Sequence, residues 1–476
     1  MKILAKYLVP ICSIFGFPAI ATAETMKPNV VFILADDMGY GDLKAYNPES
    51  KIPTPHLDAL SAAGMTFTDA HSGGSTCIPS RYSLLTGRFA ARKDKFSDKQ
   101  PVIEDGRTTV AGMLRESGYR TVMVGKWHLG FNRLVEREKG PEFDYNQPIT
   151  GGPVDRGFDS FFGMHASLDI QPYFYMRDRT PTMAPTEKAE ANDSMGTDEN
   201  WNRIQGAFWR EGDIGPDFKF IEVTPRFADE ASKVIEEHDQ GKPLFLYLPL
   251  PSPHTPWLPT EEFVGKSGAG MYGDFTMLVD AVVGQITASL EKAGMSENTM
   301  VFFSSDNGPV WYEKDVELFD HKSVGPLRGI KASVWEGGHR VPFVVKWPGK
   351  VKAGSRSDDL VAFADVFATL GEIAGSEAQG EGVAEDSVSF LPSLKGIESD
   401  KKRPPVLHGG KTIRDGNWKL IATKGSRGFN AEKGVKFGIE LYNLRKDLSE
   451  QDNLAEEMPE KVDKLKKKIE DILASE

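Results

Sequence analysis

The sequence contains few cysteines, and beyond its amino terminus it has no long apolar run and no basic tract. Only 2 of the 476 residues are cysteine, Cys12 and Cys77, so a small scaffold held together by several disulfides is excluded. After position 23 no apolar stretch reaches the roughly 18 residues expected of a membrane-spanning helix. Acidic residues outnumber basic ones, 69 to 57. These features argue against an integral membrane protein and against a nucleic-acid partner.

Residues 1–23 have the pattern of a cleaved signal peptide. Lys2 and Lys6 precede the apolar run 7–20, and Ala21-Thr22-Ala23 has the small-x-small form of a signal-peptidase site. As a membrane anchor, the run would be shorter than the roughly 20 residues that span a bilayer, and prolines interrupt it. We therefore predict a periplasmic or secreted protein that makes no membrane contact after cleavage.

Cleavage would change the meaning of the cysteine count. Cys12 would leave with the signal peptide, so Cys77 would remain without a partner for an intramolecular disulfide. A lipoprotein would retain Cys12, but Ile11 stands where such a site needs a small residue. An unpaired cysteine in an exported protein calls for a chemical explanation.

The pattern of apolar segments indicates an α/β fold. Short runs rich in β-branched and aromatic residues, typical of buried strands, occupy 29–34, 121–124, 244–248, 300–303 and 341–345. One predicted helix starts at Pro225 and closes at Gly241, and another covers 275–292. This alternation predicts a large, mostly parallel sheet with helices on both faces. In such sheets functional side chains gather at the carboxyl ends of the strands.

A change of composition near 352–358 divides the chain. We predict a large amino-terminal domain over 24–355 and a smaller carboxyl-terminal subdomain over 356–476, which contains a charged helix at 458–473. Between about 130 and 220 regular periodicity fades, and Gly, Pro, Asp and aromatic residues dominate. Long irregular segments of this kind often carry function.

Two pairs of oxygen-bearing residues follow two of the predicted strands. Asp36 and Asp37 come after the first strand, and Asp306 and Asn307 follow the strand at 300–303. Because carboxylate and amide oxygens suit hard cations, we predict that these four side chains bind calcium or magnesium. No histidine or cysteine belongs to the set, which argues against zinc. Taken alone, the first pair could equally cap the next helix.

The remaining cysteine lies in a distinctive motif. Pro79 and the apolar spacing after it predict that a helix begins here, with Cys77 at its amino end. The free N–H groups and the dipole of a helix favour an anion at that end. A single cysteine is most often a buried structural residue, but the pattern Cys77-Ile78-Pro79-Ser80-Arg81 is specific enough to weaken that interpretation.

Together these motifs resemble those of the formylglycine-dependent, arylsulfatase-like sulfatases of the alkaline phosphatase superfamily. The matching segments are Asp36-Asp37-Met38-Gly39-Tyr40-Gly41-Asp42, the run from Cys77 to Arg88, Gly125-Lys126-Trp127-His128-Leu129-Gly130, Ser252-Pro253-His254-Thr255-Pro256, Ser305-Asp306-Asn307-Gly308, Gly329-Ile330-Lys331 and Glu336-Gly337-Gly338-His339-Arg340-Val341-Pro342. Matches at 413–420 and 440–444 imply that the carboxyl-terminal subdomain contains an antiparallel sheet. The resemblance also implies a divalent cation, and conversion of Cys77 to formylglycine (3-oxoalanine) by a formylglycine-generating enzyme.

The same resemblance implies a catalytic set. Its members are Cys77, Arg81, Lys126, His128, His254 and Lys331. One hydroxyl of the hydrated aldehyde at position 77 would attack sulfur, while the basic residues bind the hydrate and the sulfate oxygens. His254 or Lys331 would protonate the departing oxygen. His128 would then accept the proton of the second hydroxyl, so that sulfate is expelled.

Residues for substrate recognition are expected outside the matched motifs. The candidates are His165, Arg177, Trp209, Arg210, Trp311 and His321, a mixture suited to stacking on sugar rings and pairing with additional sulfates. The resemblance leans towards polysaccharide sulfatases of marine bacteria, so we predict a sulfated red-algal galactan such as carrageenan as the substrate. Aryl sulfates and glycosaminoglycans are alternatives. A phosphoesterase or a non-catalytic glycan-binding protein of the same fold is a further alternative, against which the complete catalytic set argues.

Overall fold

The computed structural model describes residues 27–93, 95–132, 135–137, 140–194, 205–376, 378, 382–397, 403–408, 411–422, 428–429 and 438–475. The predicted signal peptide lies outside these residues. Among the residues described, no helix combines the length and the apolarity needed to cross a bilayer.

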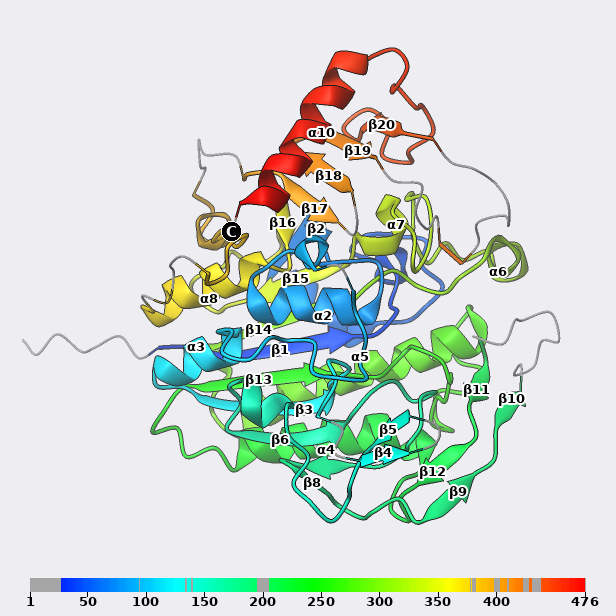
Figure 1. Cartoon of the computed structure of the whole chain (residues 1–476), viewed down its shortest axis with the longest axis vertical. Coiled ribbons are helices and arrows are strands. Elements are labelled where there is room, and N and C mark those ends of the chain that lie inside the picture. Colours follow the sequence, from blue (N-terminus) through cyan, green and yellow to red (C-terminus); the bar gives the residue numbers. More distant parts are fainter. Residues whose placement is uncertain are drawn as a thin grey trace, which may run out of the picture.

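A ten-stranded mixed sheet forms the centre of the molecule (Figure 1). Its strands, in spatial order, are β16 (Ser355–Ala362), β2 (Met65–His71), β15 (Phe343–Lys346), β14 (Thr299–Ser305), β1 (Asn29–Ala35), β13 (Leu244–Pro249), β3 (Arg120–Lys126), β6 (Ser160–Met164), β7 (Met176–Arg177) and β8 (Thr180–Pro181). Strands β14, β1, β13, β3 and β6 run parallel to one another, whereas β15 is antiparallel to both β14 and β2, and β7 is antiparallel to β6. The predicted α/β fold with a mostly parallel sheet is confirmed.

Helices cover both faces of the sheet because the strands bury both sets of alternate side chains. In β1, Val30 and Phe32 join one hydrophobic cluster, and Val31 and Ile33 join another. The first cluster includes residues of α2 (Cys77–Thr86), α3 (Val110–Glu116) and α8 (Asp365–Ala374). The second includes residues of α1 (Pro55–Ala63), α4 (Val223–Glu236) and α5 (Gly270–Lys292). The two predicted helices correspond to α4 and α5, each of which begins earlier than predicted.

The segment predicted to be irregular contains short paired strands. Strand β4 (Val135–Arg137) pairs with β5 (Gly140–Glu142), β9 (Glu187–Ala189) with β12 (Gly212–Ile214), and β10 (Asn192–Ser194) with β11 (Ala207–Trp209). The short helices of the chain are α6 (Glu313–Phe319), α7 (Glu336–His339), α9 (Leu391–Leu394) and the 3₁₀ turns Tyr40–Asp42, Ala90–Arg92, Pro153–Arg156, Phe220–Glu222 and Ser296–Asn298.

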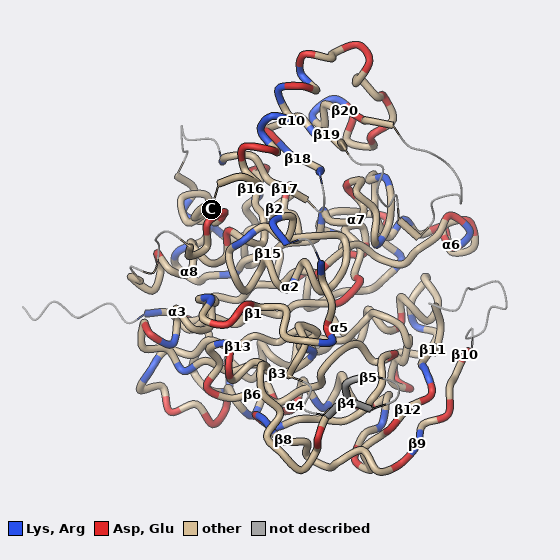
Figure 2. Tube along the Cα trace, in the orientation of Figure 1, with Lys and Arg blue, Asp and Glu red and all other residues tan. Residues whose placement is uncertain are grey.

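A four-stranded antiparallel sheet forms the carboxyl-terminal part, as predicted. It consists of β17 (Val406–His408), β18 (Thr412–Asp415), β19 (Trp418–Ile421) and β20 (Glu440–Asn443). Helix α10 (Pro459–Ala474) packs on this sheet through an apolar stripe that includes Leu465 and Ile469, and Figure 2 shows both signs of charge along it. Strand β16, which follows the predicted boundary at 355, is an outer strand of the central sheet beside β2.

Candidate active site

The two predicted cation-binding pairs meet at the carboxyl edge of the central sheet. Strands β1 and β14 are parallel neighbours whose last residues, Ala35 and Ser305, are in register. The next residue on each strand therefore lies at the same edge, where Asp306 N–H donates to the Ala35 carbonyl at 3.0 Å and Asp37 N–H donates to Asp306 Oδ1 at 3.3 Å. All four side chains, Asp36, Asp37, Asp306 and Asn307, are buried.

Cys77 faces this acidic group from the first residue of α2. Its Sγ donates to Asp36 Oδ1 at 3.3 Å and lies 3.7 Å from Lys331 Nζ. Burial, with the nearby Asp306 and Asp36 carboxylates, raises the pKa of the Cys77 thiol well above its usual range. The predicted helix start is confirmed, and it places the cysteine beside both a carboxylate and an ammonium group.

Three buried basic side chains are paired with the carboxylates. Arg81 donates from Nε and Nη2 to Asp306 Oδ2 at 2.9 and 2.8 Å. Lys126 forms an ion pair with Asp36, and Lys331 Nζ lies 2.6 Å from Asp37 Oδ1. Burial alone would raise the pKa of Asp36, but Lys126, His254 and Arg81 hold it well below its usual range.

Asp306 behaves differently from its neighbour Asp36. Burial and the Asp36 charge raise the pKa of Asp306 to about 6, although Arg81 opposes the shift. Two carboxylates so close together therefore differ in their affinity for a proton. The guanidinium of Arg81 also donates from Nη1 to the Lys126 carbonyl at 2.9 Å, which links α2 to the end of β3.

The two predicted catalytic histidines lie at the rim of the same group. His254 Nδ1 contacts the Thr255 carbonyl at 2.6 Å. Because a carbonyl only accepts, Nδ1 carries the proton, and in the neutral ring the lone pair is on Nε2, 3.7 Å from Asp37 Oδ2. The Nε2 atom of His254 therefore faces the carboxylates, where it can exchange a proton.

His128 follows β3 with a positive φ of 56°, and its side chain is buried. Burial, followed by the Lys126 and Arg81 charges, lowers the pKa of His128 well below its usual range. Its Nε2 lies 3.8 Å from Asp98 Oδ2. Asp98 was not identified from the sequence because it lies in a segment without motif or periodicity.

The oxygen atoms at this edge fit a hard cation. Asn307 Nδ2 donates to Asp37 Oδ1 at 2.6 Å and to the Gly308 carbonyl at 2.9 Å. Its Oδ1 is buried and has no hydrogen-bond partner among the described residues. A buried acceptor without a donor, next to the carboxylates of Asp36, Asp37 and Asp306, is what an oxygen-coordinated cation requires. One atom each of Asp36, Asp37, Cys77 and His254 also lies within 4.8 Å of the others.

Glycine is required where the Glu336 motif approaches this edge. Gly308 N–H donates to the Gly338 carbonyl at 2.9 Å. A Cβ on Gly308 would lie 1.8 Å from the Gly337 carbonyl oxygen, so a larger residue would push the two loops apart. The close approach explains why the segments at 305–308 and 336–342 both contain glycine.

Three of the six predicted substrate-binding residues are buried in the fold. His165 Nε2 contacts the Pro172 carbonyl at 2.9 Å, and its ring stacks on Phe174. His321 is fully buried and bonds Asp42 Oδ1 at 2.9 Å, and Trp311 donates to the His321 carbonyl at 2.8 Å. Such contacts favour a structural role for His165 and His321, since these rings have almost no surface left for a sugar.

The other three candidates contact side chains from other segments of the chain. Arg177 forms an ion pair with Glu230 at 2.9 Å, and Arg210 forms one with Asp169 at 2.5 Å. Trp209 stacks on Phe220 with ring centroids 4.5 Å apart. The structure thus brings the predicted catalytic and cation-binding residues together, and among the described residues no hydrogen bond or ion pair joins these three side chains to them.

Comparison with known proteins agrees with this arrangement. Residues 28–376 match the family model described as Sulfatase. The chain is 31% identical to an N-acetylgalactosamine-6-O-sulfatase of Bacteroides thetaiotaomicron, with 94% of each chain covered. It is 32% identical to the N-acetylgalactosamine-6-sulfatase of Mus musculus, over 86% of this chain and 74% of the relative.

Solved structures show the same fold. A Bacteroides thetaiotaomicron structure concerned with the metabolism of multiple glycosaminoglycans matches with a TM-score of 0.82 and 30% identity, covering 94% of this chain and 100% of that chain. The structure of Ps i-CgsB with k-i-k-neocarrahexaose matches with a TM-score of 0.70 over 94% of this chain and 93% of that one, and its 22% identity shows a shared fold alone. With most of its length matched by the family model and by these relatives, the chain belongs to the sulfatase family of the alkaline phosphatase superfamily.

Proposed function

We propose that this sulfatase removes sulfate esters from a sulfated glycan, with formylglycine at position 77 as its nucleophile and a bound divalent cation. The observation that carries the proposal is the position of Cys77, buried at the start of α2 between Asp36 and Lys331. The raised pKa of the unmodified thiol makes it a poor thiolate nucleophile at neutral pH. A hydrated aldehyde would supply two hydroxyl groups there, one to attack sulfur and one to release sulfate.

The cation would be held by Asp36, Asp37, Asp306 and Asn307. Calcium suits this set of oxygen ligands, and magnesium is the alternative. When bound, it would polarise the sulfate ester and offset the negative charge that develops during transfer. Arg81 supports the site by fixing the Asp306 carboxylate through two hydrogen bonds.

The remaining residues would divide proton transfer between them. Lys331 lies beside both Cys77 and Asp37, so its ammonium group could stabilise the sulfate oxygens or protonate the departing alcohol. His254 shares Asp37 as a neighbour and is the second candidate for that proton. His128, kept neutral by burial and by neighbouring cations, is suited to accept a proton when sulfate is released.

Mass spectrometry of the peptide that contains Cys77 tests the nucleophile. In protein from the native host, we expect the aldehyde-bearing peptide and its hydrate. Only unmodified thiol in an active preparation would overturn the proposal. Activity against phosphate esters but not sulfate esters would instead favour a phosphoesterase, and binding of sulfated glycans without turnover would favour a non-catalytic protein.

The relatives favour an amino-sugar substrate within the glycan class. Two of them are named for N-acetylgalactosamine 6-sulfate and cover most of this chain, which supports a galacto-configured sugar with a 6-sulfate. The carrageenan-type galactan expected from the sequence is the second candidate, because a structural neighbour was solved with a neocarrahexaose. The two candidates share galactose stereochemistry and differ in the substituent at carbon 2.

A surface pocket lined in part by the segment that precedes Lys331 is a candidate sugar subsite. Its lining includes Trp311, Tyr312, Arg328 and Gln451, with Ile330 directly preceding Lys331. The largely buried Trp311 thus contributes an edge to this pocket, which supports its predicted role.

Defined substrates would separate the two glycan classes. We expect release of sulfate from 6-sulfated N-acetylgalactosamine oligosaccharides to exceed release from carrageenan oligosaccharides and from aryl sulfates, measured by ion chromatography and NMR. The reverse order would support the galactan, and faster turnover of aryl sulfates would remove glycan specificity.

The predicted signal peptide at 1–23 supports a periplasmic or secreted enzyme, which amino-terminal sequencing of the native protein would test.

A further inference from the structure

A second polar centre lies where the central sheet meets the carboxyl-terminal sheet. Three histidines form it, each at the end of an element: His71 ends β2, His339 ends α7 and His408 ends β17. At 0%, 1% and 2% exposure, all three rings are buried. We call these three residues the histidine cluster. Since they come from three separate parts of the chain, only the tertiary fold unites them.

The ring nitrogens of the histidine cluster converge. His71 Nδ1 and His339 Nδ1 are 3.0 Å apart, and one nitrogen of each of the three rings lies within 4.8 Å of the other two. The rings of His339 and His408 stack with centroids 4.1 Å apart. Three imidazoles within this separation have the composition of a transition-metal site.

The outward nitrogens have the partners that metal-ligating histidines use. His71 Nε2 contacts Asp69 Oδ1 at 2.8 Å, and His339 Nε2 lies 3.3 Å from the Val334 carbonyl. If both Nε2 atoms carry protons, the two Nδ1 lone pairs face each other and require a cation between them. Lys419 Nζ also lies 3.2 Å from His339 Nε2, and this donor favours the tautomer of His339 with its proton on Nδ1. Metal binding would instead select the tautomer with the proton on Nε2.

His408 supplies an independent observation. Neither its Nδ1 nor its Nε2 has a hydrogen-bond partner among the described residues, although the ring is buried. In a buried imidazole at least one ring nitrogen normally has a hydrogen-bond partner. Two ring nitrogens without such a partner therefore point to a ligand or an ion.

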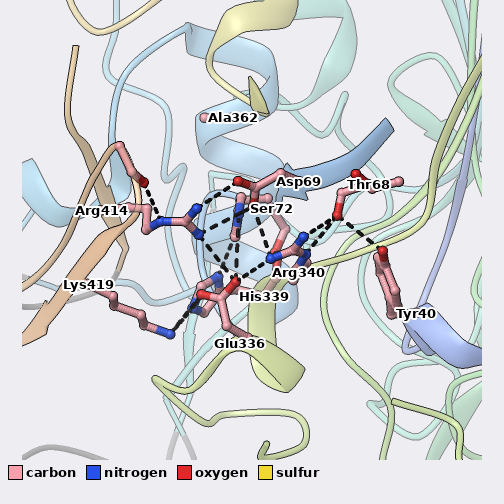
Figure 3. Close-up of polar contacts among 12 residues, drawn as sticks. Tyr40, Thr68, Asp69, Ser72, Glu336, His339, Arg340, Ala362, Arg414 and Lys419 are labelled. Carbon is pink, nitrogen blue, oxygen red and sulfur yellow. Dashed lines mark hydrogen bonds and ion pairs between the residues drawn. The ribbon is translucent and has the colours of Figure 1, made fainter. Parts of the chain in front are cut away.

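Charged side chains of both signs surround the histidine cluster. Figure 3 shows Arg414 and Lys419 of the carboxyl-terminal sheet reaching towards Asp69 and Glu336. The three cations are Arg340, Arg414 and Lys419, and the three carboxylates are Asp69, Glu336 and Glu450. The carboxylate of Glu336 lies 3.9 Å from His71 Nε2 and from His339 Nε2, on the outward side of both rings.

We propose that the histidine cluster binds one transition-metal ion, with zinc as the expected occupant, separate from the cation of the active site. Its three nitrogen donors suit zinc, whereas the oxygen donors beside Cys77 suit calcium or magnesium. A metal held by His71, His339 and His408 would tie β2, α7 and β17 together. It would therefore stabilise the junction between the two sheets without taking part in sulfate transfer.

Zinc retention by the untagged protein tests this site. The chain would be stripped with a chelator, reloaded with zinc in excess calcium to occupy the active site, and passed over a desalting column. Elemental analysis should find about one zinc per wild-type chain. His408→Gln should lose that zinc. His238→Gln should retain it, because His238 is a buried histidine that lies outside the histidine cluster and bonds the Lys242 carbonyl. Equal retention by wild type and His408→Gln, or none by wild type, would overturn the proposal.

A measurement on the wild-type protein covers the case in which His408→Gln fails to fold. X-ray absorption at the zinc edge should show scattering from about three imidazole rings. A shell made only of oxygen would place the zinc at the carboxylates and refute the assignment. Thermal unfolding adds a functional readout: zinc should raise the Tm of the wild type and of His238→Gln. No rise in Tm for a zinc-loaded wild type would contradict the stabilising role.

Discussion

The active site and the histidine cluster are both buried and charged, yet their charged groups serve different ends. At the active site the carboxylates of Asp36, Asp37 and Asp306 crowd one sheet edge, and the pKa is lowered for Asp36 but raised for Asp306. Around the histidine cluster, three cations and three carboxylates pair across the junction of two sheets. Both sites pair carboxylates with buried cations, but the first gathers its oxygen atoms at one sheet edge, where a cation can bind, and the second joins side chains of two sheets.

The largest effect should come from removing the nucleophile. Cys77→Ala should lower kcat by at least about 10⁴-fold, because the chemical step loses its attacking group. The Tm should change little, because the substitution removes only one sulfur atom and that atom lies among polar groups. Ser83→Ala in the same helix is the matched control and should keep activity. Initial rates with a sulfated substrate, together with Tm, give the answer, and near-normal turnover by Cys77→Ala would break the assignment.

Removing the active-site cation should have the next largest effect. After exhaustive chelation we expect activity to fall by about 10³-fold, because the charge on the transferring group loses its main stabilisation. Calcium or magnesium should restore activity, whereas zinc limited to one equivalent should not. Full activity in metal-free protein, verified by elemental analysis, would contradict the cation site. Recovery with zinc alone would blur the distinction between the two centres.

The pH dependence of activity should report the protonation of His128. Its pKa is lowered, so the neutral base form persists to pH values below the ordinary 6.5 and is lost only on further acidification. Activity that needs this base should therefore be present above the lowered pKa and decline as pH falls through it. His128→Gln should reduce kcat by about 10²-fold and alter the acid limb of the profile. An unchanged acid limb in that variant would assign the titration to another group.

The smallest effect on catalysis, and a clear one on stability, should come from the paired charges. Arg414→Met removes one of the two arginine partners of the buried Asp69 carboxylate, 2.7 Å away, and should lower the free energy of unfolding by about 1.5–3 kcal/mol. Lys467→Met, which removes an exposed partner of Asp471, should change it by less than about 1 kcal/mol. Denaturant unfolding of both variants measures the difference. Equal effects would show that the junction does not depend on its buried pairs.

Much of the active site could be predicted because its residues follow strands. Asp36 and Asp37 continue directly from β1, and Asp306 and Asn307 continue from β14, so parallel register brings them together. The α2 start at Cys77 was readable from Pro79 and the apolar spacing after it. Asp98 was missed because its place beside His128 depends on the path of an irregular segment.

The candidates for sugar binding show where residue type is a poor guide. His165 and His321 looked like surface ligands because histidine is polar, but packing buries both rings and engages their nitrogens. Tertiary burial, which no local pattern encodes, decides whether such a ring faces solvent. Arg177 and Arg210 form ion pairs with carboxylates that lie 53 and 41 residues away in the sequence, so local patterns could not predict these pairs.

By itself, the sequence determined the alternation of strands and helices, the oxygen-rich residues at strand ends and the motif around Cys77. These features depend on local spacing, and parallel strands convert local spacing into a shared edge. Only the tertiary structure decided which polar groups pair across long distances. His71, His339 and His408 meet because the fold brings the ends of β2, α7 and β17 together, and the energy of that contact depends on burial and charge pairing that no single segment contains.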